Sequence, residues 1–180
     1  DVRRTWFETH QRVLRLASAL QRQGVATGDT VSIIATNIPE LFEAHFGVPM
    51  AGAVLNAINT RLDPAAIAFI LDHAETKVLI VDPEFSGIAH EAIGLASRTD
   101  LLVIDIEDPC FGESTRIGAM TYAALLESGD SGFIWEGPAS EWDAIALNYT
   151  SGTTGDPKGV VYNHRGAFLN ALSHIVDWGM

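Results

Sequence analysis

Two short runs of large apolar residues constrain the fold most strongly. Residues 77–82 read Lys-Val-Leu-Ile-Val-Asp, and residues 101–105 read Leu-Leu-Val-Ile-Asp. Uninterrupted apolar runs of this length are typical of strands buried on both faces. Segments with apolar residues at helical spacing lie between the predicted strands. The sequence therefore predicts an α/β fold with a doubly wound, largely parallel sheet and helices on both faces.

Capping residues mark where several helices begin. Thr5 and Glu8 form a capping-box pattern, in which each side chain bonds the backbone N–H of the other residue. Asp63 precedes a proline at the first helical position, and Asn163 precedes the last apolar-periodic segment. We therefore expect helices to begin directly after Thr5, Asp63 and Asn163.

A further helix is expected to follow the predicted strand at residues 30–35. Asn37 is expected to cap it, and Gly47 and Pro49 are expected to bend or interrupt it before another strand at residues 53–58.

Residues 150–159, TSGTTGDPKG, contain three glycines, four hydroxyl side chains and one lysine, with no large apolar residue. Apolar or β-branched runs flank this stretch at 144–147 and 160–162, so it is predicted to be a loop between two strands. Glycine lets the backbone approach a ligand closely and lets successive N–H groups point at one anion. Hydroxyls add donors, and Lys158 adds a charge-assisted bond. This composition suits a loop that wraps a polyphosphate, and the alternative is a flexible connection with a solvated lysine.

The loop is not a Walker loop. Such a loop needs Gly-Lys-Ser/Thr at its end, whereas here Pro157 precedes Lys158 and Gly159 follows it. The β-branched exit also favours a strand over a helix directly after the loop.

Residues 149–160, YTSGTTGDPKGV, resemble the phosphate-loop signature of adenylate-forming enzymes. That superfamily includes acyl-CoA synthetases, peptide-synthetase adenylation domains and firefly-type luciferases. Residues 37–56 and 59–63 resemble the acyl-CoA synthetase branch, and within it the medium-chain fatty acyl and 3-methylmercaptopropionate CoA ligases.

The resemblance implies that the chain is part of the large N-terminal domain of such an enzyme. Residues 1–140 would form a first α/β subdomain, and residues 141–180 would begin the next subdomain, which carries the phosphate loop. The boundary is expected near 135–142. The chain would be an amino-terminal fragment that lacks the C-terminal domain and the catalytic residues, and alone it is expected to be inactive.

The implied activity is the ATP-dependent activation of a fatty or related carboxylic acid, followed by transfer of the acyl group to CoA. ATP, Mg²⁺ and CoA are the implied cofactors, and Thr150 is the candidate for contacting the metal or its water. Two alternatives are an enzyme that loads another carboxylate, such as an amino acid, onto a carrier protein, and a non-catalytic nucleotide-binding module. The residues implied to hold the phosphates are Thr150, Ser151, Gly152, Thr153, Thr154, Gly155, Asp156, Pro157 and Lys158.

Composition excludes some classes of function. The chain has 23 acidic and 11 basic residues, a formal charge of −12, which argues against nucleic acid as a partner. Cys110 is the single cysteine, which indicates a reducing compartment, and we expect a cytoplasmic location. No stretch is apolar enough for a membrane span. A small carboxylic acid is the expected partner, and a homodimer is possible.

The remaining polar and aromatic candidates are assigned ordinary roles. The six histidines show no metal-ligand spacing, and His164 with Arg165 is expected to shape the corner between the last strand and helix. Trp135 and Trp142 are interpreted as packing residues. Asp82 and Asp105 lie at strand ends, where ligands gather in α/β folds, but no role is assigned to them.

Overall fold

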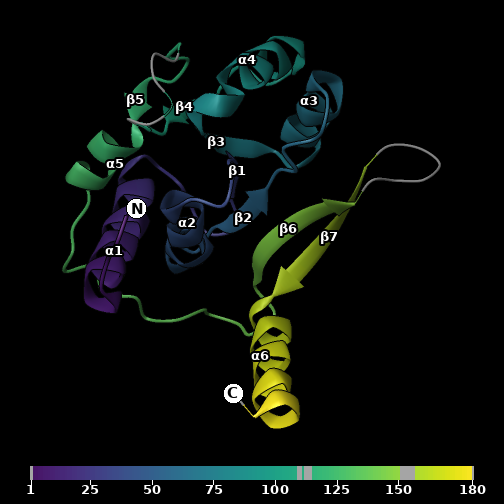
Figure 1. Cartoon of the computed structure of the whole chain (residues 1–180). Coiled ribbons are helices and arrows are strands. Elements are labelled where there is room, and N and C mark those ends of the chain that lie inside the picture. The colour runs from purple at the N-terminus through teal and green to yellow at the C-terminus, as the bar shows by residue number, and fades with distance from the viewer. Residues whose placement is uncertain (1, 109–110, 112–114, 151–156, 180) are drawn as a thin grey trace.

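The computed structural model describes residues 2–108, 111, 115–150 and 157–179 (Figure 1). In these ranges one seven-stranded sheet has the order β5-β4-β3-β1-β2-β6-β7. All neighbouring strands are parallel except β6 and β7, which are antiparallel. The predicted doubly wound, largely parallel sheet is therefore confirmed. The strands are β1 Thr30–Ile34, β2 Val54–Ala57, β3 Thr76–Val81, β4 Leu102–Asp105, β5 Met120–Thr121, β6 Ala144–Thr150 and β7 Lys158–Asn163.

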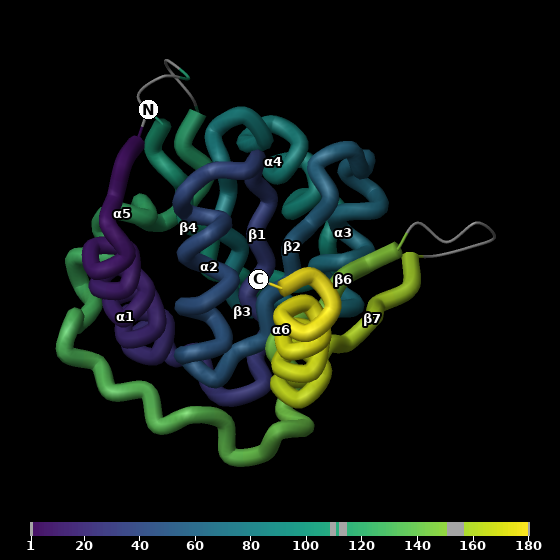
Figure 2. Tube along the Cα trace, turned by 60° about the horizontal axis from the view of Figure 1, so that its bottom comes forward, coloured from purple at the N-terminus to yellow at the C-terminus, as the bar shows by residue number. Residues whose placement is uncertain are grey.

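Helices cover both faces of the sheet (Figures 1 and 2). One core cluster joins α1, α2 and α5 to one face of the sheet through residues such as Leu16, Val48 and Leu125. A second cluster joins α3 and α4 to the opposite face through Ile70 and Ala89. The described helices are α1 Trp6–Arg22, α2 Pro39–Met50, α3 Pro64–His73, the 3₁₀ turn η1 Pro83–Phe85, α4 Ser86–Leu95, α5 Tyr122–Ser128 and α6 His164–Trp178.

The central strands are buried because they face both helix layers. Every residue of β1 is buried. Two adjacent residues of this strand, Ile33 and Ile34, belong to the two different clusters. Adjacent side chains on a strand point to opposite faces, so one strand contributes to both cores. This is the arrangement that the uninterrupted apolar runs predicted.

The helix starts at three predicted caps are confirmed. The Thr5 hydroxyl accepts from the Glu8 N–H at 3.2 Å, while the Thr5 N–H donates to the Glu8 carboxylate at 2.7 Å. The side chains of Asp63 and Asn163 each accept from the backbone N–H three residues further on, at 2.8 and 2.7 Å. Each cap supplies a partner to an N–H that the helix itself cannot satisfy.

The prediction for α2 was wrong in two respects. Its N-cap is Ile38 rather than Asn37, and Ile38 makes no side-chain cap bond. Gly47 and Pro49 lie inside the helix, which continues to Met50, so the predicted interruption is wrong while the predicted bend stays a prediction. Pro49 falls in the last turn, where its missing N–H removes one hydrogen bond of the helix. Gly47 serves packing, because a Cβ there would lie 2.7 Å from the Leu16 side chain of α1.

Glu43, on the buried side of α2, joins four parts of the first helix layer. Its carboxylate accepts hydrogen bonds from Arg4 at 2.7 Å, from Arg12 at 2.5 Å and from the Tyr122 hydroxyl at 2.9 Å. Glu43 is only 1% exposed, so these donors replace its lost hydration. Burial and the Glu43 charge raise the pKa of Tyr122 well above its usual range, so the phenol stays protonated and donates. The carboxylate thus ties the N-terminal segment, α1 and α5 to α2.

Replacing Glu43 with Gln is expected to lower the free energy of unfolding by about 3 kcal/mol, because two arginines then lose their buried counter-charge. Urea denaturation of the purified protein measures this loss. Glu40→Gln is the control, since the Glu40 carboxylate lies 4.0 and 3.9 Å from the same arginines and is more exposed. It should cost less than about 1 kcal/mol. Equal losses for the two variants would contradict the assignment of Glu43 as the central group.

Candidate functional site

The predicted phosphate loop lies at the end of a β-hairpin. β6 and β7 pair in antiparallel register, with Thr150 opposite Lys158 and Tyr149 opposite Gly159. The predicted strands on both sides of the loop are therefore confirmed, and Figure 1 shows the hairpin projecting from one edge of the sheet. Among the predicted site residues, Ser151, Gly152, Thr153, Thr154, Gly155 and Asp156 lie outside the described residues.

The mouth of the hairpin carries a hydroxyl and a cation. Register places Thr150 and Lys158 across from each other, and the Thr150 hydroxyl donates to the Lys158 carbonyl oxygen at 3.5 Å. This long hydrogen bond is weak, so the hydroxyl keeps the capacity to bind another group. Lys158 is exposed, and no carboxylate in the described ranges forms an ion pair with it. The arrangement presents one donor and one positive charge where the chain enters and leaves the loop.

Packing inside the hairpin leaves little room for a side chain at Gly159. It lies within β7, and a Cβ there would come 2.9 Å from Leu147 Cδ1 and 3.5 Å from the Tyr149 ring. Its backbone is not among the described glycines with positive φ. Composition predicted that the glycines of this stretch allow the close approach of a phosphate, whereas for Gly159 the structure indicates space for side chains of β6.

Tyr149, directly before the loop, contacts helix α3. Its hydroxyl lies 2.7 Å from His73 Nδ1, and its ring meets the His73 ring edge-on with centroids 5.7 Å apart. The His73 ring in turn stacks on Phe69 with centroids 5.4 Å apart. Burial raises the pKa of Tyr149 above its usual value. The role of His73 could not be predicted from the sequence, because nothing in the helical spacing of Phe69 and His73 connects His73 with a tyrosine 76 residues away.

The corner after β7 is held by the segment that precedes β6. The backbone N–H groups of His164 and Arg165 donate to the carbonyl oxygens of Asp143 and Glu141 at 3.1 and 2.8 Å. The Arg165 guanidinium also bonds the Glu141 carboxylate at 2.8 Å and lies 5.4 Å above the Trp142 ring. The expectation that His164 and Arg165 shape this corner is confirmed, and Trp142 packs against the arginine.

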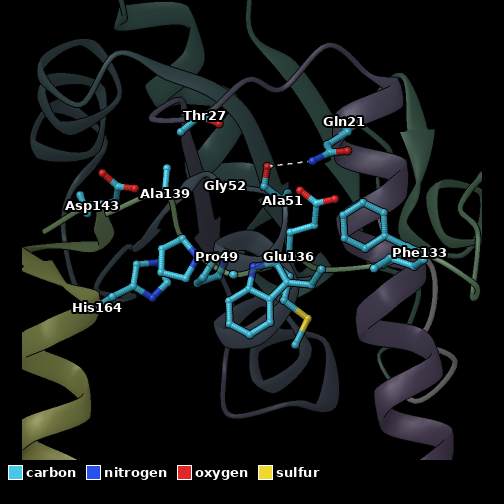
Figure 3. A pocket seen from close by; sticks show the side chains of 16 residues that line it. Gln21, Thr27, Pro49, Ala51, Gly52, Phe133, Glu136, Ala139, Asp143 and His164 are labelled. Atoms are coloured by element: carbon cyan, nitrogen blue, oxygen red, sulfur yellow. Dashed lines mark hydrogen bonds between the residues drawn. The ribbon is translucent and has the colours of Figure 1, made fainter. Parts of the chain in front are cut away.

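A pocket of about 350 Å³ lies beside this corner (Figure 3). It is lined by the ends of α1 and α2, by residues 133–139 and by His164 and Asp143. Trp135, expected to serve packing, lines this pocket with 42% of its surface exposed. Because the pocket adjoins Ala144 at the start of β6, it lies at the opposite end of that strand from Thr150.

The carboxylates at the ends of β3 and β4 hold the chain in turns. Asp82 accepts from the Thr36 N–H at 3.2 Å and from the Thr36 hydroxyl at 3.1 Å. Asp105 accepts from the N–H groups of Gly118 and Ile117 at 2.9 and 3.2 Å. Both side chains are buried and satisfied by these donors, so their role in the described structure is to fix loops.

The described residues contain no group of three or more His, Cys, Asp or Glu placed to hold a metal ion. At the mouth of the loop the Thr150 hydroxyl is an oxygen donor of the kind that a hard cation such as Mg²⁺ accepts beside its waters. Among the helices that the structure describes, none has the length and apolarity needed to cross a bilayer.

Comparison with known proteins identifies the family. The model of the AMP-binding enzyme family matches residues 1–180. The chain belongs to the AMP-binding enzyme family. A peroxisomal acetate/butyrate–CoA ligase of Arabidopsis thaliana is 46% identical over 98% of this chain and 33% of that protein. An acetate–CoA ligase of Humulus lupulus is 44% identical over the same shares.

Solved structures of this family share the fold. An anthranilate–CoA ligase in complex with anthranoyl-AMP superimposes with a TM-score of 0.81, 27% identity, and coverage of 91% of this chain and 30% of that one. A structure assigned as a long-chain-fatty-acid CoA ligase from Rhodopseudomonas palustris gives 0.82 at 25% identity, over 99% of this chain and 42% of that one. The sheet thus matches the N-terminal domain of adenylate-forming CoA ligases. The chain spans about a third of the length of the curated relatives named above.

Gly159→Ala is expected to destabilise the protein by about 1 kcal/mol, because the new methyl group must push the end of the Leu147 side chain aside. The free energy of unfolding measures the change. Gly94→Ala on α4 is a matched control, since its Cβ would meet open space. That variant should gain about 0.5 kcal/mol from helix propensity. A neutral or stabilising Gly159→Ala would show that the hairpin has room there.

The pKa of His164 is lowered below 6.5 by burial, with Asp143 opposing the shift. The neutral ring is thus favoured in the folded state, so its contribution to stability is complete above about pH 6.5 and decreases as the pH falls toward the lower folded-state pKa. Urea midpoints measured above and below this pH should differ less for His164→Gln than for the unchanged protein. His90→Gln, at an exposed position on α4, should keep the original difference. Loss of the difference in the His90 variant instead would contradict this assignment.

Proposed function

We propose that the protein is an ATP-dependent acyl-CoA synthetase in which this chain binds the phosphates of ATP. The observation that carries the proposal is the hairpin register, which brings Thr150 and Lys158 together at the mouth of the TSGTTGDPKG loop. A hydroxyl and a cation on either side of a glycine-rich turn match the chemistry of a triphosphate. CoA ligase names among the relatives support this choice of reaction.

The reaction has two steps. A carboxylate oxygen of the acid attacks the α-phosphorus of ATP, and the bond from that phosphorus to the pyrophosphate breaks, which gives acyl-adenylate. The thiol of CoA, losing its proton to solvent, then attacks the acyl carbonyl carbon and releases AMP. The first step requires charge neutralisation on the leaving pyrophosphate, so positioning and electrostatics dominate it.

In this proposal the loop residues hold the β- and γ-phosphates, and Lys158 supplies the positive charge. Mg²⁺, when bound, neutralises phosphate oxygens, and the Thr150 hydroxyl is the residue proposed to touch it or its water. The weak hydrogen bond of that hydroxyl within the hairpin leaves it available. The residues proposed to line the phosphate site are Thr150, Ser151, Gly152, Thr153, Thr154, Gly155, Asp156, Pro157 and Lys158.

We also propose a division of the chain into subdomains, a substrate class, a location and an assembly. Residues 1–140 would form one subdomain and 141–180 the start of the next, which is supported by α6, where none of the residues is buried. We propose a small carboxylic acid as substrate, a cytoplasmic location in keeping with the single cysteine, and a homodimer as the assembly to test.

ATP–pyrophosphate exchange by the full-length protein tests the function. A panel of fatty, short-chain and amino acids should show exchange with non-amino carboxylic acids. Exchange with amino acids only would instead indicate an enzyme that loads amino acids onto a carrier protein. No exchange with any acid, in protein shown to be folded, would refute the proposal.

Lys158→Ala should slow adenylation about 10- to 100-fold, the worth of one charge-assisted hydrogen bond, with the order of preferred acids unchanged. Lys77→Ala is the matched control, since Lys77 is the other lysine of the chain and bonds Asp29 and the Gly24 carbonyl, both at 2.7 Å. Its exchange rate should stay at the original level. A change of acid preference at normal rate in Lys158→Ala would show that the lysine contacts the acid instead.

A further inference from the structure

The end of the hairpin that carries the loop has little support from the sheet. β6 pairs with β2 through Leu55 and Ala146, and the later residues of β6 pair with β7. A hollow of about 360 Å³ lies between the hairpin residues Leu147, Gly159 and Val161 and the start of β1 near Thr30. We call residues 147–150 and 158–161 the outer hairpin. Backbone pairing alone leaves the direction of the outer hairpin weakly determined.

Helix α3 supplies the missing contact through Phe69, His73 and Tyr149, which we call the aromatic clamp. The hydrogen bond between the Tyr149 hydroxyl and His73 Nδ1 is 2.7 Å long. In the part of the chain that the structure describes, no other side-chain hydrogen bond joins the outer hairpin to a helix. The His73 ring is held in turn, since it stacks on Phe69 at an interplanar angle of 21°. Both Phe69 and Tyr149 pack against the core cluster under α3.

The clamp acts on the residue next to the loop. Tyr149 directly precedes Thr150, and adjacent side chains of a strand point to opposite faces. When the Tyr149 ring is fixed on α3, the plane of the strand at Thr150 is fixed too. Gly159 lies directly across from Tyr149, and a Cβ there would be in ordinary van der Waals contact with the ring, 3.5 Å away. The clamp and the mouth of the loop thus form one connected unit.

We propose that the aromatic clamp sets the direction of the hairpin strands at Thr150 and Lys158, which makes His73 and Tyr149 positioning residues for the phosphates of ATP. This inference rests on the proposed function of the loop. A displacement of about 1 Å is enough to impair a positioned reaction, and the hydrogen bond resists such a displacement. His73 and Tyr149 do not touch the reacting atoms, so their effect belongs to ATP binding and not to the choice of acid.

The test uses the full-length protein and ATP–pyrophosphate exchange. Tyr149→Phe keeps the ring and removes the hydroxyl, and His73→Leu removes its partner. Each should raise the KM for MgATP about fivefold, the worth of one ordinary hydrogen bond, and leave the KM for the acid unchanged. The double variant should be no worse than either single variant, because both remove the same bond. His73→Asn, whose amide can take the place of Nδ1, should stay close to the unchanged protein.

Asp72→Asn is the control for general damage to α3. The Asp72 carboxylate accepts from the N–H groups of Ser97 and Arg98 at 2.9 and 3.1 Å. This variant therefore weakens a contact between α3 and the segment after α4, away from the clamp. It should lower the melting temperature and leave the KM for MgATP unchanged. An equal rise of that KM in Asp72→Asn would overturn the inference, since any weakening of α3 would then produce it.

The failure of the clamp and the failure of the function are distinguishable. If the unchanged protein catalyses exchange but Tyr149→Phe and His73→Leu keep its KM for MgATP, the clamp is refuted and the function stands. If the unchanged protein catalyses no exchange, the function is refuted. The affinity for MgATP, measured by calorimetric titration, then tests the clamp independently of the catalysed reaction. Equal affinities of the unchanged protein and Tyr149→Phe, or no binding at all, refute it, and a fivefold weaker affinity of the variant supports it.

Discussion

The structure depends on the burial of one sheet between two layers of helices. β1 and β3 lie at the centre, and their side chains enter the core under α1 and α2 on one face and the core under α3 and α4 on the other. Burial of apolar area is the dominant favourable contribution to folding. Here each central strand buries apolar side chains on both of its faces. The hairpin β6–β7 extends from this double core, to which the pairing of β6 with β2 and the contact of Tyr149 with His73 on α3 connect it.

Polar groups inside this apolar frame are few and have specific partners. Glu43 binds two arginines and a tyrosine, while Asp82 and Asp105 bind backbone N–H groups at the ends of strands. A buried carboxylate without such donors would cost several kcal/mol. These side chains therefore specify how loops and helices join the sheet. The carboxylates that a search for catalytic residues would notice first are engaged in structure, and the groups at the mouth of the hairpin stay available.

Local patterns explain which features could be predicted from the sequence. The apolar runs, the capping residues and the strands on both sides of the loop depend on neighbours within a few residues, so composition and spacing reveal them. Asn37 misled because Pro39 occupies the first helical position of α2, which makes Ile38 the N-cap and leaves Asn37 one residue too early. Gly47 resembled a helix breaker, yet its role is the close approach of Leu16. The contact between His73 and Tyr149 and the partners of Glu43 join distant segments, and no local pattern encodes them. Of the candidate site, the sequence alone predicted the position of the loop between strands, whereas the register of Thr150 with Lys158 required the structure.

A structure of the full-length protein crystallised with MgATP, or a non-hydrolysable analogue, tests the central claim most directly. The account predicts that the β- and γ-phosphates lie in the loop between β6 and β7, with the Lys158 ammonium group within hydrogen-bonding distance of a phosphate oxygen. A triphosphate bound at another place, with this loop empty, would contradict it.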